Sequence, residues 1–87
     1  MISKTATIIN TQGLHMRPAT IFAGEMGKFE SDVTLRFDGR EINAKSVINL
    51  IAAGIKCGSE VEIICNGADE TAALEKAAEL IASGLGE

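Results

Sequence analysis

The sequence has few of the residues on which several common protein classes depend. Its 87 residues include no tryptophan or tyrosine, three phenylalanines, two cysteines and one histidine. The core must therefore be built from isoleucine, valine, leucine, alanine and methionine. Cys57 and Cys65 are too few for the disulfide framework of a small secreted protein. One histidine and no cysteine pair at metal spacing argue against a structural zinc site, and we expect no metal or cofactor.

Basic residues are also in deficit, with 8 against 12 acidic ones and a net charge of -4. No run of interleaved basic and aromatic residues indicates binding to nucleic acid. A local basic site would need the fold to gather four separate cations: Lys28, Arg36, Arg40 and Lys45. No segment has the pattern of a signal peptide, and no apolar run can span a bilayer. We therefore expect a cytoplasmic protein without membrane insertion.

The spacing of apolar residues changes along the chain between the alternation typical of strands and the period typical of helices. Strands are expected at 3–10, 32–37, 40–43 and 60–66, and helices at 16–27, 47–53 and 70–84. Asp38-Gly39 is a strong hairpin signal, and Ser46 and Asp69 are typical helix N-caps. The final helix carries an apolar stripe: Leu74, Ala77, Ala78, Ile81 and Leu85.

The residues expected on the two faces of the strands indicate the fold class. Inward strand positions are apolar, whereas Thr5, Thr7, Thr34 and Arg36 suit a face in contact with water. Four short strands and three helices whose stripes face one way predict an α+β fold of order β-α-β-β-α-β-α. The sheet would be antiparallel or mixed, with the helices on one side. A chain of this length fits a single domain, residues 1–87.

The single histidine occupies a position that favours phosphate chemistry. His15 directly precedes the first predicted helix, whose N-terminus offers backbone N–H groups and partial positive charge. The same dipole favours a neutral imidazole, which is the nucleophilic form. Arg17 would neutralise a phosphoryl group, and Pro18 would stiffen the turn. These residues indicate a phosphoryl acceptor; the alternative is a histidine that only begins a helix.

A relay is favoured over hydrolysis. The P–N bond of phosphohistidine is labile, and phosphoryl transfer needs mainly positioning and charge stabilisation. A stand-alone hydrolase or metal enzyme would need more titratable groups around one pocket than this chain offers.

Ser46 begins a second candidate site. As an N-cap it contributes about 1 kcal/mol, which is a purely structural role. A phosphate there would meet the helix N-terminus and add roughly two negative charges. With Leu50 inward, we expect an exposed docking patch for a partner protein, made of Val47, Ile48 and Ile51. The alternative is that these three residues belong to the core.

Two motifs resemble those of one family. Gly13-Leu14-His15-Met16-Arg17-Pro18-Ala19-Thr20 resembles the active-site signature of HPr, the phosphocarrier of the bacterial phosphoenolpyruvate:sugar phosphotransferase system. Asn43-Ala44-Lys45-Ser46, followed by an apolar helix, resembles the signature around that family's regulatory serine. The resemblance covers essentially the whole chain. It implies an open-faced β-sandwich: a four-stranded antiparallel-type sheet with three helices on one face.

The resemblance implies a carrier and not an enzyme. His15 would accept phosphate on Nδ1 from enzyme I and donate it to sugar-specific IIA proteins, with Arg17 assisting at the phosphate. Ser46 would be the target of an HPr kinase/phosphorylase where one exists, and phosphorylated Ser46 would serve a catabolite-control regulator. A monomer is expected, because such partners are transient.

Three residues depart from the family pattern. Met16 stands where alanine is usual, and it would alter the contact with enzyme I or shield the imidazole. Ile48 and Asn49 stand where members with the regulatory serine often have methionine and glycine, which bears on kinase and corepressor recognition. The alternative function is an HPr-like regulatory module acting mainly through Ser46. A related regulatory paralogue lacks the active histidine, so His15 favours the carrier.

Overall fold

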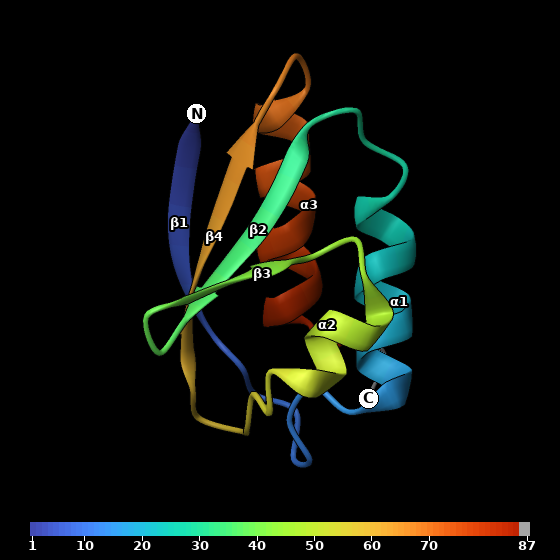
Figure 1. Ribbon diagram of the computed structural model, residues 1–87, viewed down its shortest axis with the longest axis vertical. Helices are drawn as coiled ribbons and strands as arrows, with labels where there is room; N and C mark the ends of the chain where they lie inside the picture. The colour runs from blue at the N-terminus through green and yellow to red at the C-terminus, as the bar shows by residue number, and fades with distance from the viewer. Residues whose placement is uncertain (86–87) are drawn as a thin grey trace.

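The computed structural model describes residues 1–85, which form one sheet with helices on one of its faces (Figure 1). The predicted order β-α-β-β-α-β-α is confirmed. The elements are β1 (Ile2–Thr7), α1 (Met16–Met26), β2 (Asp32–Phe37), β3 (Arg40–Asn43), α2 (Val47–Ala52), β4 (Glu60–Asn66) and α3 (Glu70–Ala82). The last two residues of the predicted domain, 86 and 87, lie outside the described residues.

The sheet is antiparallel throughout, with strand order β1-β4-β2-β3. The first strand ends at Thr7 and not at Asn10, because its partner β4 begins at Glu60, the residue opposite Thr7. The hairpin between β2 and β3 is confirmed: Asp38 and Gly39 both have positive φ, at 54° and 76°. Two consecutive positive φ angles give the tight turn whose twist matches that of the flanking strands.

The sheet register separates a buried face from an open one. On the open face, Arg36 donates to Glu41 at 3.0 Å and to Glu62 at 3.1 Å.

The other three cations considered for a local basic site are engaged elsewhere. Lys28 pairs with Glu25, Arg40 donates to the Ala53 carbonyl, and Lys45 donates to the Phe29 carbonyl. The structure thus does not gather these four cations into one basic site.

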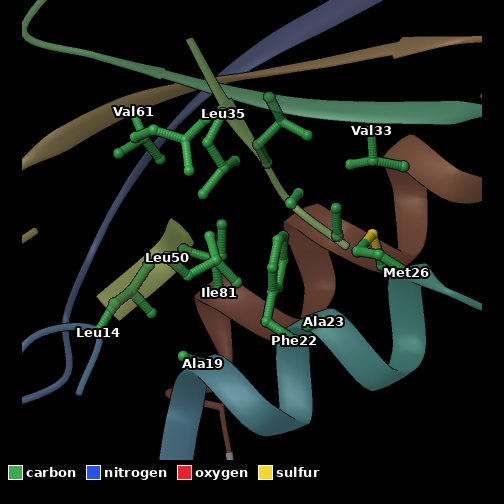
Figure 2. Close-up of a cluster of buried hydrophobic side chains, with 14 of the residues drawn as sticks. Leu14, Ala19, Phe22, Ala23, Met26, Val33, Leu35, Leu50, Val61 and Ile81 are labelled. Carbon is green, nitrogen blue, oxygen red and sulfur yellow. The ribbon is translucent and has the colours of Figure 1, made fainter. Parts of the chain in front are cut away.

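The core lies between the sheet and the helices (Figure 2). Helix α1 contributes a buried stripe made of Ala19, Phe22, Ala23 and Met26. The predicted stripe of α3 is partly wrong, because Leu74 and Ala78 are only partly buried. The fully buried line is Ala73, Ala77 and Ile81, with Leu85 beyond the helix end. Small alanines on this line let α3 approach the sheet closely, which a leucine at position 73 would prevent.

Asp69 is the N-cap residue of α3, as predicted, but its side chain makes no cap hydrogen bond. Its Oδ2 accepts from the Glu30 N–H at 2.9 Å, and its Oδ1 accepts from the N–H of Ser31 at 2.9 Å and from the Ser31 hydroxyl. This Asp69 clasp (Asp69, Glu30 and Ser31) joins the start of α3 to the loop before β2. The carboxylate accepts hydrogen bonds from the loop in preference to the helix end.

The Asp69 clasp makes stability depend on pH in acid. Hydrogen bonds from the Ser31 hydroxyl and the Glu30 N–H hold the pKa of Asp69 below its ordinary value of 3.8. A folded-state pKa below the unfolded value means that the unfolded chain binds the proton more tightly. The stabilisation from the clasp is therefore complete at pH values above the pKa of Asp69 in the unfolded chain. It is lost as the pH falls through the pKa of Asp69 in the folded protein.

We expect the urea midpoint of the unaltered chain to exceed that of Asp69→Asn at neutral pH. The difference should shrink as the pH falls below 3.8. Unfolding curves of both proteins across the acid range measure it. A difference that stays constant down to about pH 2 would show that the carboxylate charge is not what the clasp uses.

Candidate functional site

His15 is the N-cap residue of α1. Its backbone is extended, with φ of -83° and ψ of -168°, and its carbonyl accepts from the Ala19 N–H at 3.0 Å. The side chain is half-buried and makes no cap hydrogen bond to the helix. The imidazole is therefore not committed to holding the helix end. This placement at the head of α1 is the one that the sequence predicts.

The first turn of α1 presents donors next to His15. The N–H groups of Met16 and Arg17 lie at the first two helical positions, where no intrahelical acceptor exists. The third position is Pro18, which has no N–H and is buried. The Thr20 hydroxyl donates to the Met16 carbonyl at 2.7 Å, which braces the turn. The turn thus offers two N–H groups and the exposed Arg17 guanidinium to an anion.

The segment before His15 is anchored to the loop that follows α2. The Leu14 N–H donates to the Ile55 carbonyl at 2.9 Å, and the Leu14 side chain enters the same buried cluster as Ala19 and Leu50 (Figure 2). Gly13 has φ of 71°, and a Cβ built there would lie 2.3 Å from the Ile55 oxygen. The close approach needs glycine, and it fixes the backbone two residues before the imidazole.

Ser46 is the N-cap of α2, as predicted. Its Oγ accepts from the Asn49 N–H at 3.3 Å, and its side chain is half-buried. Leu50 is fully buried, whereas Ile48 is 77% and Ile51 38% exposed and Val47 is partly buried. The expected exposure of the docking patch (Val47, Ile48 and Ile51) is therefore confirmed for Ile48 and Ile51. Val47 packs partly against the core.

The two candidate sites share one region of the molecule. Helices α1 and α2 pack against each other, and α2 lies beside the N-terminal part of α1 (Figure 1). Arg40 donates to the Ala53 carbonyl at 2.9 Å, holding the end of α2 two residues before Ile55. Sequence reasoning missed these contacts with Ile55 and Ala53, because nothing local marks a backbone carbonyl as an acceptor for a distant residue.

The two cysteines have different environments. Cys57 is exposed in the loop before β4, and Cys65 is buried in β4, where desolvation raises the pKa of its thiol. Residues 1–85 contain no group of three or more metal-ligating side chains. Across the same range, no helix combines the length and the apolar character needed to cross a membrane.

Comparison with known proteins identifies close relatives. Residues 2–83 match a family model described as "PTS HPr component phosphorylation site". The chain is 41% identical over 78 residues to the HPr-like protein Crh of Bacillus subtilis, covering 90% of this chain and 92% of that one. It is 39% identical over 74 residues to the phosphocarrier protein HPr of Treponema pallidum, covering 85% and 84%.

Solved structures agree in fold. The crystal structure of HPr-C-His from Thermoanaerobacter tengcongensis superposes with a TM-score of 0.95 at 36% identity, covering 100% of this chain and 98% of that one. A crystal structure of an HPr dimer from the same organism has a TM-score of 0.79 at 36% identity, with both chains fully covered. The expectation of a monomer is therefore not supported, because dimers occur among the relatives.

Proposed function

The chain belongs to the HPr family of phosphocarriers, and we propose that it carries the phosphoryl group on His15, between enzyme I and sugar-specific IIA proteins in the cytoplasm. Members of this family are carriers and not catalytic enzymes. One observation supports the proposal most: His15 stands half-exposed at the head of α1, beside N–H groups and Arg17. In this arrangement the His15 imidazole would accept the phosphoryl group, and the neighbouring groups would stabilise its negative charge.

The proposed transfer proceeds in two steps of the same kind. Imidazole Nδ1 attacks the phosphorus of the donor, so that a P–N bond forms as the donor's bond to phosphorus breaks. Arg17 and the N–H groups of Met16 and Arg17 stabilise the negative charge on the phosphoryl oxygens. The nucleophile of the IIA protein then attacks the same phosphorus, and neutral His15 is regenerated. Pro18 keeps the turn rigid through both steps.

The test is the intact mass of the chain after incubation with phosphoenolpyruvate and enzyme I. One added phosphate that is lost on brief acid treatment supports the proposal, because phosphohistidine is acid-labile. No added phosphate with an enzyme I that labels another HPr overturns it.

We also propose that Met16, Ile48 and Ile51 form the surface that docks the partner proteins. Met16 is 69% exposed, so its side chain is available to a partner. Ile48 and Ile51 expose apolar area on the adjacent helix. Exposed apolar residues around a reactive group are typical of the core of a protein interface. Ser46 lies at the edge of this surface, where a phosphate would regulate docking by charge.

A negative charge at Ser46 should slow phosphorylation of His15 by enzyme I. We expect Ser46→Asp to lower the rate roughly tenfold at low salt, because charges near a docking surface mainly change the association rate. Ser3→Asp, which adds the same charge on exposed β1, is the matched control and should leave the rate unchanged. The rates are measured with limiting enzyme I, with and without added salt. Equal rates for the two variants would remove Ser46 from the docking surface.

The second candidate function is a regulatory module that acts mainly through Ser46. The 41% identity to the HPr-like protein Crh favours it. In this case ATP and a Ser46-directed kinase label the chain with an acid-stable phosphate, and the product binds a catabolite-control regulator. Labelling by the kinase together with failure of enzyme I labelling would select this function over the carrier. Labelling by both would show that the two roles coexist.

A further inference from the structure

Asn10 is a buried amide close to the candidate site. Within residues 1–85 only two polar side chains are classed as buried, Asn10 at 2% exposure and Ser31. Ser31 belongs to the Asp69 clasp. The loop before β2 and the start of α3, which the clasp joins, lie at the end of the molecule opposite to the start of α1 (Figure 1). Burying an amide costs stability unless it is hydrogen-bonded, so a buried asparagine in a loop indicates a specific partner.

Asn10 donates a hydrogen bond to the end of α3. Its Nδ2 donates to the Gly84 carbonyl at 2.5 Å, across 74 residues of sequence. That carbonyl is held in place because the helix end is closed by the Leu85 N–H, which donates to the Leu80 carbonyl at 3.0 Å. Leu85 is fully buried and keeps a positive φ of 52°. Asn10 therefore bonds to a carbonyl within a hydrogen-bonded helix end.

The backbone of the same residue leads directly to His15. The Asn10 carbonyl accepts from the Gly13 N–H at 2.9 Å, which closes a tight turn over residues 10–13. Leu14 then bonds to Ile55, and His15 follows. The loop that carries the imidazole is thus held on one side by the end of α3, through Asn10, and on the other by the loop after α2.

We propose that Asn10 is a positioning residue for His15. Its bond to the end of α3 holds the 10–13 turn in place, and this turn holds the backbone that carries the imidazole. This inference rests on the proposed phosphocarrier function. Without the Asn10–Gly84 bond, the segment keeps its backbone bonds at Gly13 and Leu14 but loses this hydrogen bond to the end of α3. The imidazole then samples positions away from the in-line geometry that phosphoryl transfer requires.

The test compares Asn10→Ala and Asn10→Leu with Ser31→Ala. Alanine removes the amide, and leucine removes it while retaining most of its volume. We expect both Asn10 variants to be phosphorylated by enzyme I roughly tenfold more slowly. We also expect the NMR signals of the His15 ring to shift and the Leu14 amide to exchange faster. Ser31→Ala removes a buried polar group far from the site, and it should lose stability while keeping the wild-type rate and His15 signals.

Wild-type rates and unshifted His15 signals in the folded Asn10 variants would overturn the proposal. The unaltered chain provides a test that does not depend on how the variants fold. A scalar coupling between the Asn10 side-chain nitrogen and the Gly84 carbonyl carbon should be measurable, and its absence overturns the proposal. If the unaltered chain accepts no phosphate, the proposed function fails, whereas ring signals and amide exchange still decide whether Asn10 positions His15.

Discussion

Replacing His15 with alanine should abolish phosphoryl acceptance from enzyme I and leave the fold in place. No other imidazole exists in the chain, so the labile P–N bond has no alternative site. The effect on stability should stay within about 1 kcal/mol, because the side chain is half-buried and makes no cap bond to α1. The measurement is intact mass after phosphoenolpyruvate and enzyme I treatment, together with a urea unfolding curve.

The control for His15→Ala is Ser46→Ala, which should still accept one acid-labile phosphate. The serine change removes an N-cap bond and should cost about 1 kcal/mol without touching the acceptor. An acid-labile phosphate on His15→Ala would refute the assignment of the site. An unfolded His15→Ala would instead give the His15 side chain a structural role.

Replacing Gly13 with alanine should be among the most damaging single changes in the chain. The backbone there has a positive φ, which costs a residue with a Cβ about 1–2 kcal/mol. The new Cβ would also lie 2.3 Å from the Ile55 oxygen and 2.8 Å from the Lys56 Cα, so the backbone must move. Forced displacement of packed atoms adds about 1–3 kcal/mol. We expect a total loss of roughly 2–5 kcal/mol and slower phosphorylation, since the Leu14–Ile55 bond precedes His15.

Gly39 provides the matched control for Gly13. Its φ of 76° is almost the same, but no atom lies within 4 Å of a Cβ built there. Gly39→Ala should therefore lose only the conformational cost of about 1–2 kcal/mol and keep the wild-type phosphorylation rate. The comparison uses urea midpoints and rates for both variants. Equal losses for Gly13→Ala and Gly39→Ala would mean that the approach to Ile55 is not tight in solution.

Much of the fold follows from local sequence pattern. The bounds of β2, β3 and β4 agree with the alternation of apolar residues, and the Asp38-Gly39 turn with its residue types. The N-cap role of Ser46 was likewise predictable, since a serine bonds to an N–H three residues away whatever the rest of the chain does. These features depend on neighbours in sequence, which the pattern contains.

Where sequence reasoning failed, a distant group competed with a local one. Asp69 has the residue type and position of a cap, but its carboxylate bonds to Glu30 and Ser31, nearly forty residues earlier. Leu74 fits a helical stripe as well as Ala73 does, and only packing against the sheet chooses the smaller residue. Strand partners were also open, because alternation does not tell which strands pair.

The sequence by itself determined the candidate acceptor and its chemistry. The imidazole, the helix start, Arg17 and Pro18 are consecutive, and their relation is local and independent of the rest of the fold. Only the tertiary structure decided how this segment is held. The contacts of Leu14 with Ile55 and of Asn10 with Gly84 join residues 41 and 74 positions apart. Such bonds depend on how the helices pack on the sheet, and no local pattern encodes that arrangement.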